Sequence, residues 1–286
     1  MWGRPRTWLL TGIPRSGSSL ACRLAGQASD VVALSEPIPR KTSAGMADPR
    51  DARDAIRRFV ARTRKGIRST GLAPSLQVGG RLDDNVVGVE AEAGLRRRRA
   101  ELGEIRIDKA LSRRFTLVVK HNALFAALLA ELTGSFDCLA LVRNPLAVLA
   151  SWQTVDLPVG RGRIPAGEQF DAELAIALDT ATSVLARQLI VLDWFFAQYA
   201  DNLPDERILR YEDLVERDGE PLYGLLGQAP ADRESLVNRN AQRAYGSTSI
   251  EDLLTALQAG GAWTRFYDVA DCERAAEAIA AAGDGA

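Results

Sequence analysis

Five short apolar runs are spaced along the chain, and polar residues follow each of them. The second, third and fourth runs are continuous rather than alternating, a pattern typical of parallel strands covered on both faces. We therefore predict five strands, at Thr7–Thr11, Val31–Leu34, Phe115–Val119, Cys138–Val142 and Arg207–Leu209.

Helical patterns follow three of these runs, over Ser19–Ala28, Ala123–Leu132 and Leu146–Trp152. The alternation of strand and helix predicts an α/β fold, a doubly wound, mainly parallel sheet flanked by helices. Ligands of such sheets bind beyond the carboxyl ends of the strands. The polar residues that follow each run are therefore the candidate site residues.

Two stretches look like additions to this framework. Residues 40–114 are charged and broken by Gly79-Gly80, and we expect helices and loops over one side of the site. Residues 165–201 have apolar side chains at three- and four-residue steps, which predicts one long helix or two. No internal repeat or low-complexity linker divides the chain, so we expect one domain over residues 1–286, with 40–114 as an insertion.

Composition narrows the possible functions. The 36 basic residues balance 37 acidic ones, which argues against a nucleic-acid binder. Cys22, Cys138 and Cys272 stand far apart without zinc-ligand spacing, and their number suits a reducing compartment. No apolar run approaches the roughly 20 residues of a membrane span, and the stretch Trp8–Leu10 is too short for a signal peptide. We expect a cytoplasmic protein with no bound metal.

A glycine-containing segment over residues 12–19 joins the first strand to the first helix. Its glycines let backbone N–H groups face an anion, and the helix N-terminus adds its dipole. A nucleoside triphosphate loop has Lys after the second glycine. Ser18 stands at that position, and Arg15 supplies the positive charge instead. This suits a 5′-phosphate carrying a sulfuryl group better than metal-assisted transfer from ATP, although a plain turn is the alternative.

Two segments resemble sulfotransferases that use 3′-phosphoadenosine-5′-phosphosulfate (PAPS). Gly12–Leu20 (GIPRSGSSL) resembles the 5′-phosphosulfate loop of tyrosylprotein and bacterial carbohydrate sulfotransferases. Leu139–Trp152 (LALVRNPLAVLASW) resembles the 3′-phosphate site, where Arg143 and Ser151 keep the family's eight-residue spacing. A guanidinium offers a planar fork to phosphate, and a hydroxyl adds a neutral donor. The alternative is an arginine paired with a carboxylate and a serine bound to backbone.

The resemblance also extends to Arg210–Leu214 (RYEDL), where it implies that Tyr211 lies near the adenine or the wall of the site. Towards the end, Gly260–Trp263 matches only the tryptophan of the family's last motif, so Arg239 or Arg243 is a candidate to complete the 3′-phosphate site. The resemblance implies a P-loop nucleotide-binding type of fold. It also implies the donor-binding residues Arg15, Ser16, Gly17, Ser18, Ser19, Arg143, Ser151 and Tyr211.

Two residues compete as the general base. Glu36 resembles the glutamate that serves as base in tyrosylprotein and some bacterial carbohydrate enzymes, about twenty residues after the phosphate loop. His121, the only histidine, lies in a segment similar to the Lys-Thr-His of cytosolic enzymes. We rank Glu36 first, and we expect Lys120 to balance charge on the sulfuryl group or the bridging oxygen. A salt-bridged glutamate and a hydrogen-bonding histidine are the structural alternatives.

We therefore expect a sulfotransferase that moves a sulfuryl group from PAPS to a hydroxyl or amine of a small-molecule or carbohydrate acceptor. A P-loop kinase using ATP and a non-catalytic protein that binds 3′-phosphoadenosine-5′-phosphate (PAP) are the alternatives. The acceptor is not specified, because residues 40–114 suit a sugar, lipid head group, phenol or peptide equally. The run Arg96–Arg99 is either a solvated helix face or a contact for an anionic acceptor.

Overall fold

A sheet of five parallel strands lies at the centre of the computed structural model, which describes residues 6–39, 42, 45–46, 48–92, 95–242, 245 and 249–284. The strand order is β2-β7-β1-β8-β9. The strands are β1 (Thr7–Gly12), β2 (Val31–Ser35), β7 (Thr116–Lys120), β8 (Asp137–Val142) and β9 (Ile208–Arg210). Each lies within one residue of a predicted apolar run, so the predicted sheet is confirmed.

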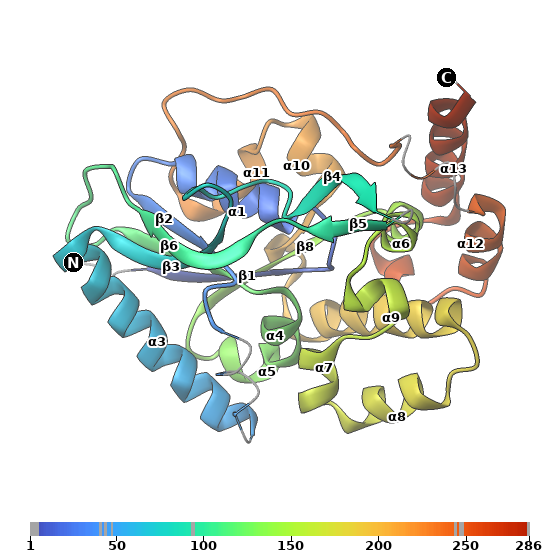
Figure 1. Ribbon diagram of the computed structural model, residues 1–286, viewed down its shortest axis with the longest axis horizontal. Coiled ribbons are helices and arrows are strands. Elements are labelled where there is room, and N and C mark those ends of the chain that lie inside the picture. Colours follow the sequence, from blue (N-terminus) through green and yellow to red (C-terminus); the bar gives the residue numbers. More distant parts are fainter. Residues whose placement is uncertain are drawn as a thin grey trace.

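Helices cover both faces of this sheet (Figure 1). Alternate residues of β1 point to opposite sides, because Trp8 and Leu10 belong to one buried cluster and Leu9 to the other. On the first side lie α1 (Ser18–Gln27) and α11 (Glu220–Leu226). The other side has α4 (Asn122–Ala127), α5 (Leu129–Leu132), α6 (Pro145–Gln153) and α9 (Val184–Asn202). The doubly wound α/β fold is thereby confirmed.

The strand order changes direction at β1. The chain runs from β1 through α1 to the edge strand β2, whereas β8 and β9 lie on the opposite side of β1. A crevice opens at the carboxyl end of a strand where such a reversal occurs, and ligands of doubly wound sheets bind there. The loop that follows β1 is therefore the place where the fold favours a ligand.

The segment before β7 contains strands that the sequence pattern did not reveal. It begins with α3 (Pro49–Thr70), and two antiparallel pairs follow, β3 (Leu72–Gln77) with β6 (Glu101–Arg106) and β4 (Val87–Glu92) with β5 (Leu95–Arg98). The expectation of helices and loops is correct for α3 and wrong for these strands. In β5 only Arg96 is buried, so its strand character is hidden in a run of charged residues.

The helical segment after α6 is divided into three helices rather than one or two: α7 (Pro165–Phe170), α8 (Ala172–Thr180) and α9. The side chain of Asp171 caps α8 by accepting from Leu174 N, and Ser183 caps α9 by accepting from Ala186 N. Such caps begin a new helix because they satisfy its free amides.

The remaining elements of the described chain are all helical. They are η1 (Pro158–Arg161), η2 (Asp205–Arg207), α10 (Tyr211–Glu216), α12 (Ile250–Leu257), η4 (Ala262–Arg265) and α13 (Val269–Asp284). Among the described helices, none combines the length and the apolar character that crossing a bilayer requires.

Candidate functional site

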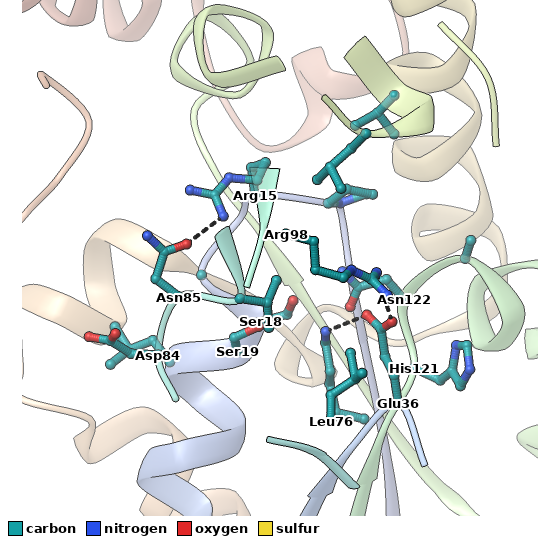
Figure 2. A pocket seen from close by; sticks show the side chains of 18 of the residues that line it. Arg15, Ser18, Ser19, Glu36, Leu76, Asp84, Asn85, Arg98, His121 and Asn122 are labelled. Carbon is teal, nitrogen blue, oxygen red and sulfur yellow. Dashed lines mark hydrogen bonds and ion pairs between the residues drawn. The ribbon is translucent and has the colours of Figure 1, made fainter. Parts of the chain in front are cut away.

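A cavity of about 950 Å³ lies at the carboxyl ends of the central strands. Its lining includes a residue from the carboxyl end of each strand: Arg15 lies three residues after β1, and Glu36, His121, Arg143 and Tyr211 directly follow β2, β7, β8 and β9. The structure therefore brings together side chains that are as far as 196 positions apart in the sequence. Figure 2 shows Arg15, Ser18, Ser19, Glu36 and His121 around this cavity.

The loop after β1 exposes backbone donors to the cavity. Gly17 adopts φ 89° and precedes α1, and no side chain caps the helix. The first amides of a helix have no intrahelical acceptor, so those of Ser18 and Ser19, which line the cavity, are available to an anion. A Cβ atom on Gly17 would lie 2.6 Å from Cδ2 of Tyr211, so this turn requires glycine. Ser16 is fully buried, and its hydroxyl has no hydrogen-bond partner among the described residues.

Arg15 lies in this loop with its backbone in the left-handed region, at φ 74°. Its Nη1 donates to Asn85 Oδ1 (2.8 Å), and its Nε donates to Ser151 Oγ (3.2 Å). Burial, together with the charges of neighbouring arginines, lowers the pKa of Arg15 to about 10. Burial is the larger cause, and the nearby charges of Arg96, Arg143 and Arg239 also lower this pKa. Such a cluster of positive charges favours an anionic ligand.

Arg143 directly follows β8 and is almost fully buried. It donates from Nη1 to the carbonyl oxygen of Arg15 (2.8 Å), from Nε to Asn240 Oδ1 (2.7 Å), and from Nη2 to the carbonyl oxygen of Arg239. All these partners are neutral oxygens, so the alternative of an arginine paired with a carboxylate is not seen among the described residues. Ser151 is fully buried and contacts Arg15, which links the two predicted phosphate-binding segments.

Tyr211 packs between the phosphate loop and the segment before Arg243. Its ring lies against Gly17, and the guanidinium of Arg143 is 4.7 Å from the ring centre. Its hydroxyl accepts a hydrogen bond from Arg239 N (2.9 Å). Arg239 also lines the cavity, as expected of a residue that completes the site, whereas Arg243 lies outside the described residues.

Glu36 and Lys120 form an ion pair beside the phosphate loop. Lys120 Nζ lies 2.8 Å from Glu36 Oε1. Arg98 Nη2 lies 3.6 Å from Glu36 Oε2 (Figure 2). Burial raises the pKa of Glu36, but the charges of Lys120, His121 and Arg98 outweigh it and lower that pKa from its usual 4.5 to about 2. Glu36 is therefore ionised at neutral pH, the protonation state that a base requires, although Lys120 weakens its basicity.

The backbone is strained at Arg15 and at Glu36, the candidate anion-binding residue and the candidate base. Only Arg15, Glu36 and Asp218 have positive φ among the described residues other than glycine, and the φ of Glu36 is 41°. Conformations of this kind cost energy and are concentrated at functional sites. Two of the three strained residues line the cavity.

His121 also lines the cavity, with its ring packed on Phe125. Burial lowers its pKa, so the imidazole is neutral at neutral pH. Its Nε2 lies 3.4 Å from the carbonyl oxygen of Ile38, which can only accept a hydrogen bond. Lys120 and His121 both contribute to the site, but Lys120 is the one in contact with Glu36.

The arginine run forms strand β5 rather than a helix face, so the helical interpretation is wrong. Arg96 is buried and donates to Thr154 Oγ1 (2.6 Å), whereas Arg98 lines the cavity beside Glu36. Side chains alternate along a strand, so Arg96 and Arg98 lie on one side of β5 and Arg97 points to the other.

Three polar residues of the site could not be identified from the sequence: Asn85, Arg98 and Asn240. Asn85 and Asn240 accept from the two arginines across 70 and 97 positions of sequence. Arg98 belongs to the run Arg96–Arg99, one of whose two interpretations is a contact for an anionic acceptor, but nothing in the run distinguishes Arg98 from its neighbours. No local pattern marks such long-range partners.

Comparisons with known proteins gave distant similarities. No family model and no curated protein matches the sequence. The structure is similar to a sulfotransferase from Alicyclobacillus acidocaldarius (TM-score 0.41, 13% identity, 98% of this chain and 97% of that chain). It is also similar to a sulfotransferase from Mycobacterium tuberculosis H37Rv (TM-score 0.35, 16% identity, 98% and 77%). At identities of 13% and 16%, the function has to be inferred from the residues of the site.

Proposed function

We propose that the protein is a sulfotransferase that moves a sulfuryl group from PAPS to a hydroxyl or amine of a small-molecule or carbohydrate acceptor. The observation that supports this most is the pair Arg15 and Arg143, two largely buried guanidiniums whose described hydrogen-bond partners are neutral oxygens. Buried cations without carboxylate partners favour anionic ligands. PAPS carries two anionic groups, the 5′-phosphosulfate and the 3′-phosphate.

The residues present fit this donor. Gly17, the first amides of α1 and Arg15 would hold the 5′-phosphosulfate, because a glycine turn at a helix N-terminus supplies several donors at once. Arg143 and Ser151 would hold the 3′-phosphate through charged and neutral donors. Tyr211 would form the wall between them, since it contacts both Gly17 and Arg143.

The donor supplies an electrophilic sulfur: the acceptor oxygen or nitrogen bonds to sulfur, the bond from sulfur to the bridging oxygen breaks, PAP leaves with that electron pair, and the acceptor proton passes to a base. Glu36 would take that proton, since it is an ionised carboxylate on the cavity wall. Lys120 would stabilise negative charge that develops on the transferred group, because its ammonium lines the cavity 2.8 Å from the carboxylate that takes the acceptor proton. His121, neutral and buried, is the second candidate for the base.

Calorimetry tests the donor. We expect PAP to bind equally well with and without EDTA, and more tightly than ATP with Mg²⁺, because Ser18 replaces the lysine of a nucleoside triphosphate loop. Tight binding of ATP with Mg²⁺ and no binding of PAP would overturn the proposal in favour of a kinase. Binding of PAP without turnover of PAPS, by any acceptor or by water, would favour a non-catalytic PAP-binding protein.

Arg143→Ala tests the 3′-phosphate site. A lost charge-assisted contact should weaken PAP by about 1.5–3 kcal/mol and weaken adenosine-5′-phosphosulfate, which lacks the 3′-phosphate, far less. Arg265→Ala is the matched control, since Arg265 pairs with Asp205 away from the cavity. Equal weakening of both ligands would show that Arg143 does not recognise the 3′-phosphate.

A further inference from the structure

The cavity has an aliphatic wall that belongs to segments other than the phosphate loop. This aliphatic wall consists of Ile38, Leu76, Leu102, Leu157, Val159 and Ile164. It adjoins Glu36, since Ile38 follows two residues later in the chain and Arg98 of β5 contacts the carboxylate. Strand β5 in turn bonds to the segment before Leu157, through Arg96 N to Thr154 O (3.0 Å) and Asp156 N to Arg96 O (3.0 Å).

The charges along this wall are paired within the protein. The described pairs are Arg98 with Glu36 (3.6 Å), Arg163 with Asp179 (2.5 Å) and Asp156 with Arg161 (2.6 Å). This contrasts with Arg15 and Arg143, whose described partners are neutral. The cavity therefore has one region with an excess of positive charge and another in which charge is compensated and the surface is aliphatic.

An acceptor must suit the second region. A hydroxyl or carboxylate placed against aliphatic side chains loses its water without gaining a hydrogen bond, at a cost of about 1–3 kcal/mol for each neutral group. A sugar would bury several such groups, and an anionic acceptor would meet cations that already have partners. An apolar body of similar size would instead gain from contact with the wall.

Leu102 is the clearest example of an aliphatic side chain open to an acceptor, because it lines the cavity while the residue is 46% exposed. Leu95, on the neighbouring pair of strands, is 38% exposed but does not line the cavity. The cavity volume of about 950 Å³ lies at the upper end of the range for single-ligand pockets. It therefore has room for an acceptor beside a nucleotide.

We propose that the acceptor is a neutral, largely aliphatic alcohol with one hydroxyl beside Glu36 and its hydrocarbon body on the aliphatic wall. The inference rests on the proposed sulfotransferase function and narrows it. The acceptor oxygen forms the bond to sulfur, PAP leaves, and Glu36 receives the hydroxyl proton.

A panel of three acceptors tests the inference on the unmodified protein with ³⁵S-labelled PAPS. The acceptors are 4-tert-butylcyclohexanol, 4-hydroxycyclohexanecarboxylate and methyl glucopyranoside. We expect kcat/KM to be at least about tenfold higher for the first, because only its apolar body matches the wall. A preference for the carboxylate or the glucoside, or equal rates for all three, would overturn the inference.

Two leucine variants locate the acceptor. Leu102→Asp should lower kcat/KM for 4-tert-butylcyclohexanol about tenfold and leave PAP affinity unchanged, whereas Leu95→Asp should change neither. Equal effects of the two variants would overturn the assignment of the wall. PAP calorimetry separates the two levels: no PAP binding removes the proposed function and the inference together, whereas PAP binding with a different ranking of acceptors removes only the inference.

Discussion

The strength of the ion pair between Glu36 and Lys120 can be measured as a change in the free energy of unfolding when one partner is replaced. The Lys120 side chain is 2% exposed, and its Nζ lies 2.8 Å from Glu36 Oε1. Lys120→Met removes the charge but keeps an unbranched apolar chain, and it leaves the carboxylate with Arg98, 3.6 Å away. Breaking a buried pair by removing one partner costs about 3–5 kcal/mol. We expect a loss of that size in the free energy of unfolding at pH 7.

The pH dependence of this loss follows from the pKa of Glu36. That pKa is about 2 in the folded protein, against its usual 4.5. Because the pKa of Glu36 is lower in the folded than in the unfolded protein, ionised Glu36 stabilises the fold by on the order of 3 kcal/mol. This stabilisation is complete above pH 4.5 and is lost as the pH falls towards 2. Lys120→Met raises the folded-state pKa, so the difference between wild type and variant should narrow as the pH falls through this range.

Urea unfolding monitored by tryptophan fluorescence at pH 7, 5, 4 and 3 measures these free energies. Lys65→Met is the control, because Lys65 is exposed on α3 and should change stability by less than about 0.5 kcal/mol. The double variant Glu36→Gln/Lys120→Met should recover part of the loss, since no buried charge is left unpaired. A loss below about 1 kcal/mol at pH 7, or an equal loss at pH 7 and pH 3, would refute the reasoning.

Three further predictions use the same site and the core. Glu36→Gln should keep PAP affinity and lower turnover by about 10²–10⁴-fold, and near-normal turnover beside an inactive His121→Asn would reverse the choice of base. Gly17→Ala should destabilise the protein and abolish PAP binding in calorimetry, because its Cβ would lie 2.6 Å from Tyr211, whereas Gly71→Ala, with φ 69° and no atom within 4 Å, should cost only backbone strain and keep binding. Burial raises the pKa of all three thiols, those of Cys22, Cys138 and Cys272, to about 12. A thiol-reactive dye at pH 8 should therefore label no cysteine until urea unfolds the protein, and rapid labelling of the native protein would contradict this.

The central sheet could be predicted, and the loop after β1 could be identified as a candidate anion site, because both signals are local. Each strand of the sheet contains a short apolar run, and residues 12–19 lead without interruption from the end of β1 into α1. Strands β3, β5 and β6 could not be predicted in this way, since β5 and β6 are largely exposed, the single buried residue of β5 is an arginine, and the buried residues of β3 include the polar Ser75 and Gln77. Periodicity detects strands only where a sheet buries apolar side chains.

The residues of the candidate site likewise fall into those with a local sequence signal and those without one. Glu36 and Arg143 could be proposed because they lie within two residues of the end of a predicted strand, and Arg15 because it lies in the glycine-containing loop after the first strand. Asn85 and Asn240, which contact Arg15 and Arg143, lie in segments without a periodic pattern and approach only through tertiary folding. Their contribution depends on long-range packing, which a single sequence does not encode in any short stretch.

The neutral oxygens around Arg15 and Arg143 have a thermodynamic consequence for ligand binding. Asn85 belongs to the segment between β3 and β4, and Asn240 to the segment between α11 and α12. A phosphate that bonds to either guanidinium exchanges existing hydrogen bonds for stronger ones, so the enthalpy of binding is a difference between two satisfied states. The same exchange would release Asn85 and Asn240 from the two arginines. If PAPS binds as proposed, its two anionic groups would thereby affect two segments that are distant in sequence, and altered amide hydrogen exchange in both should detect this.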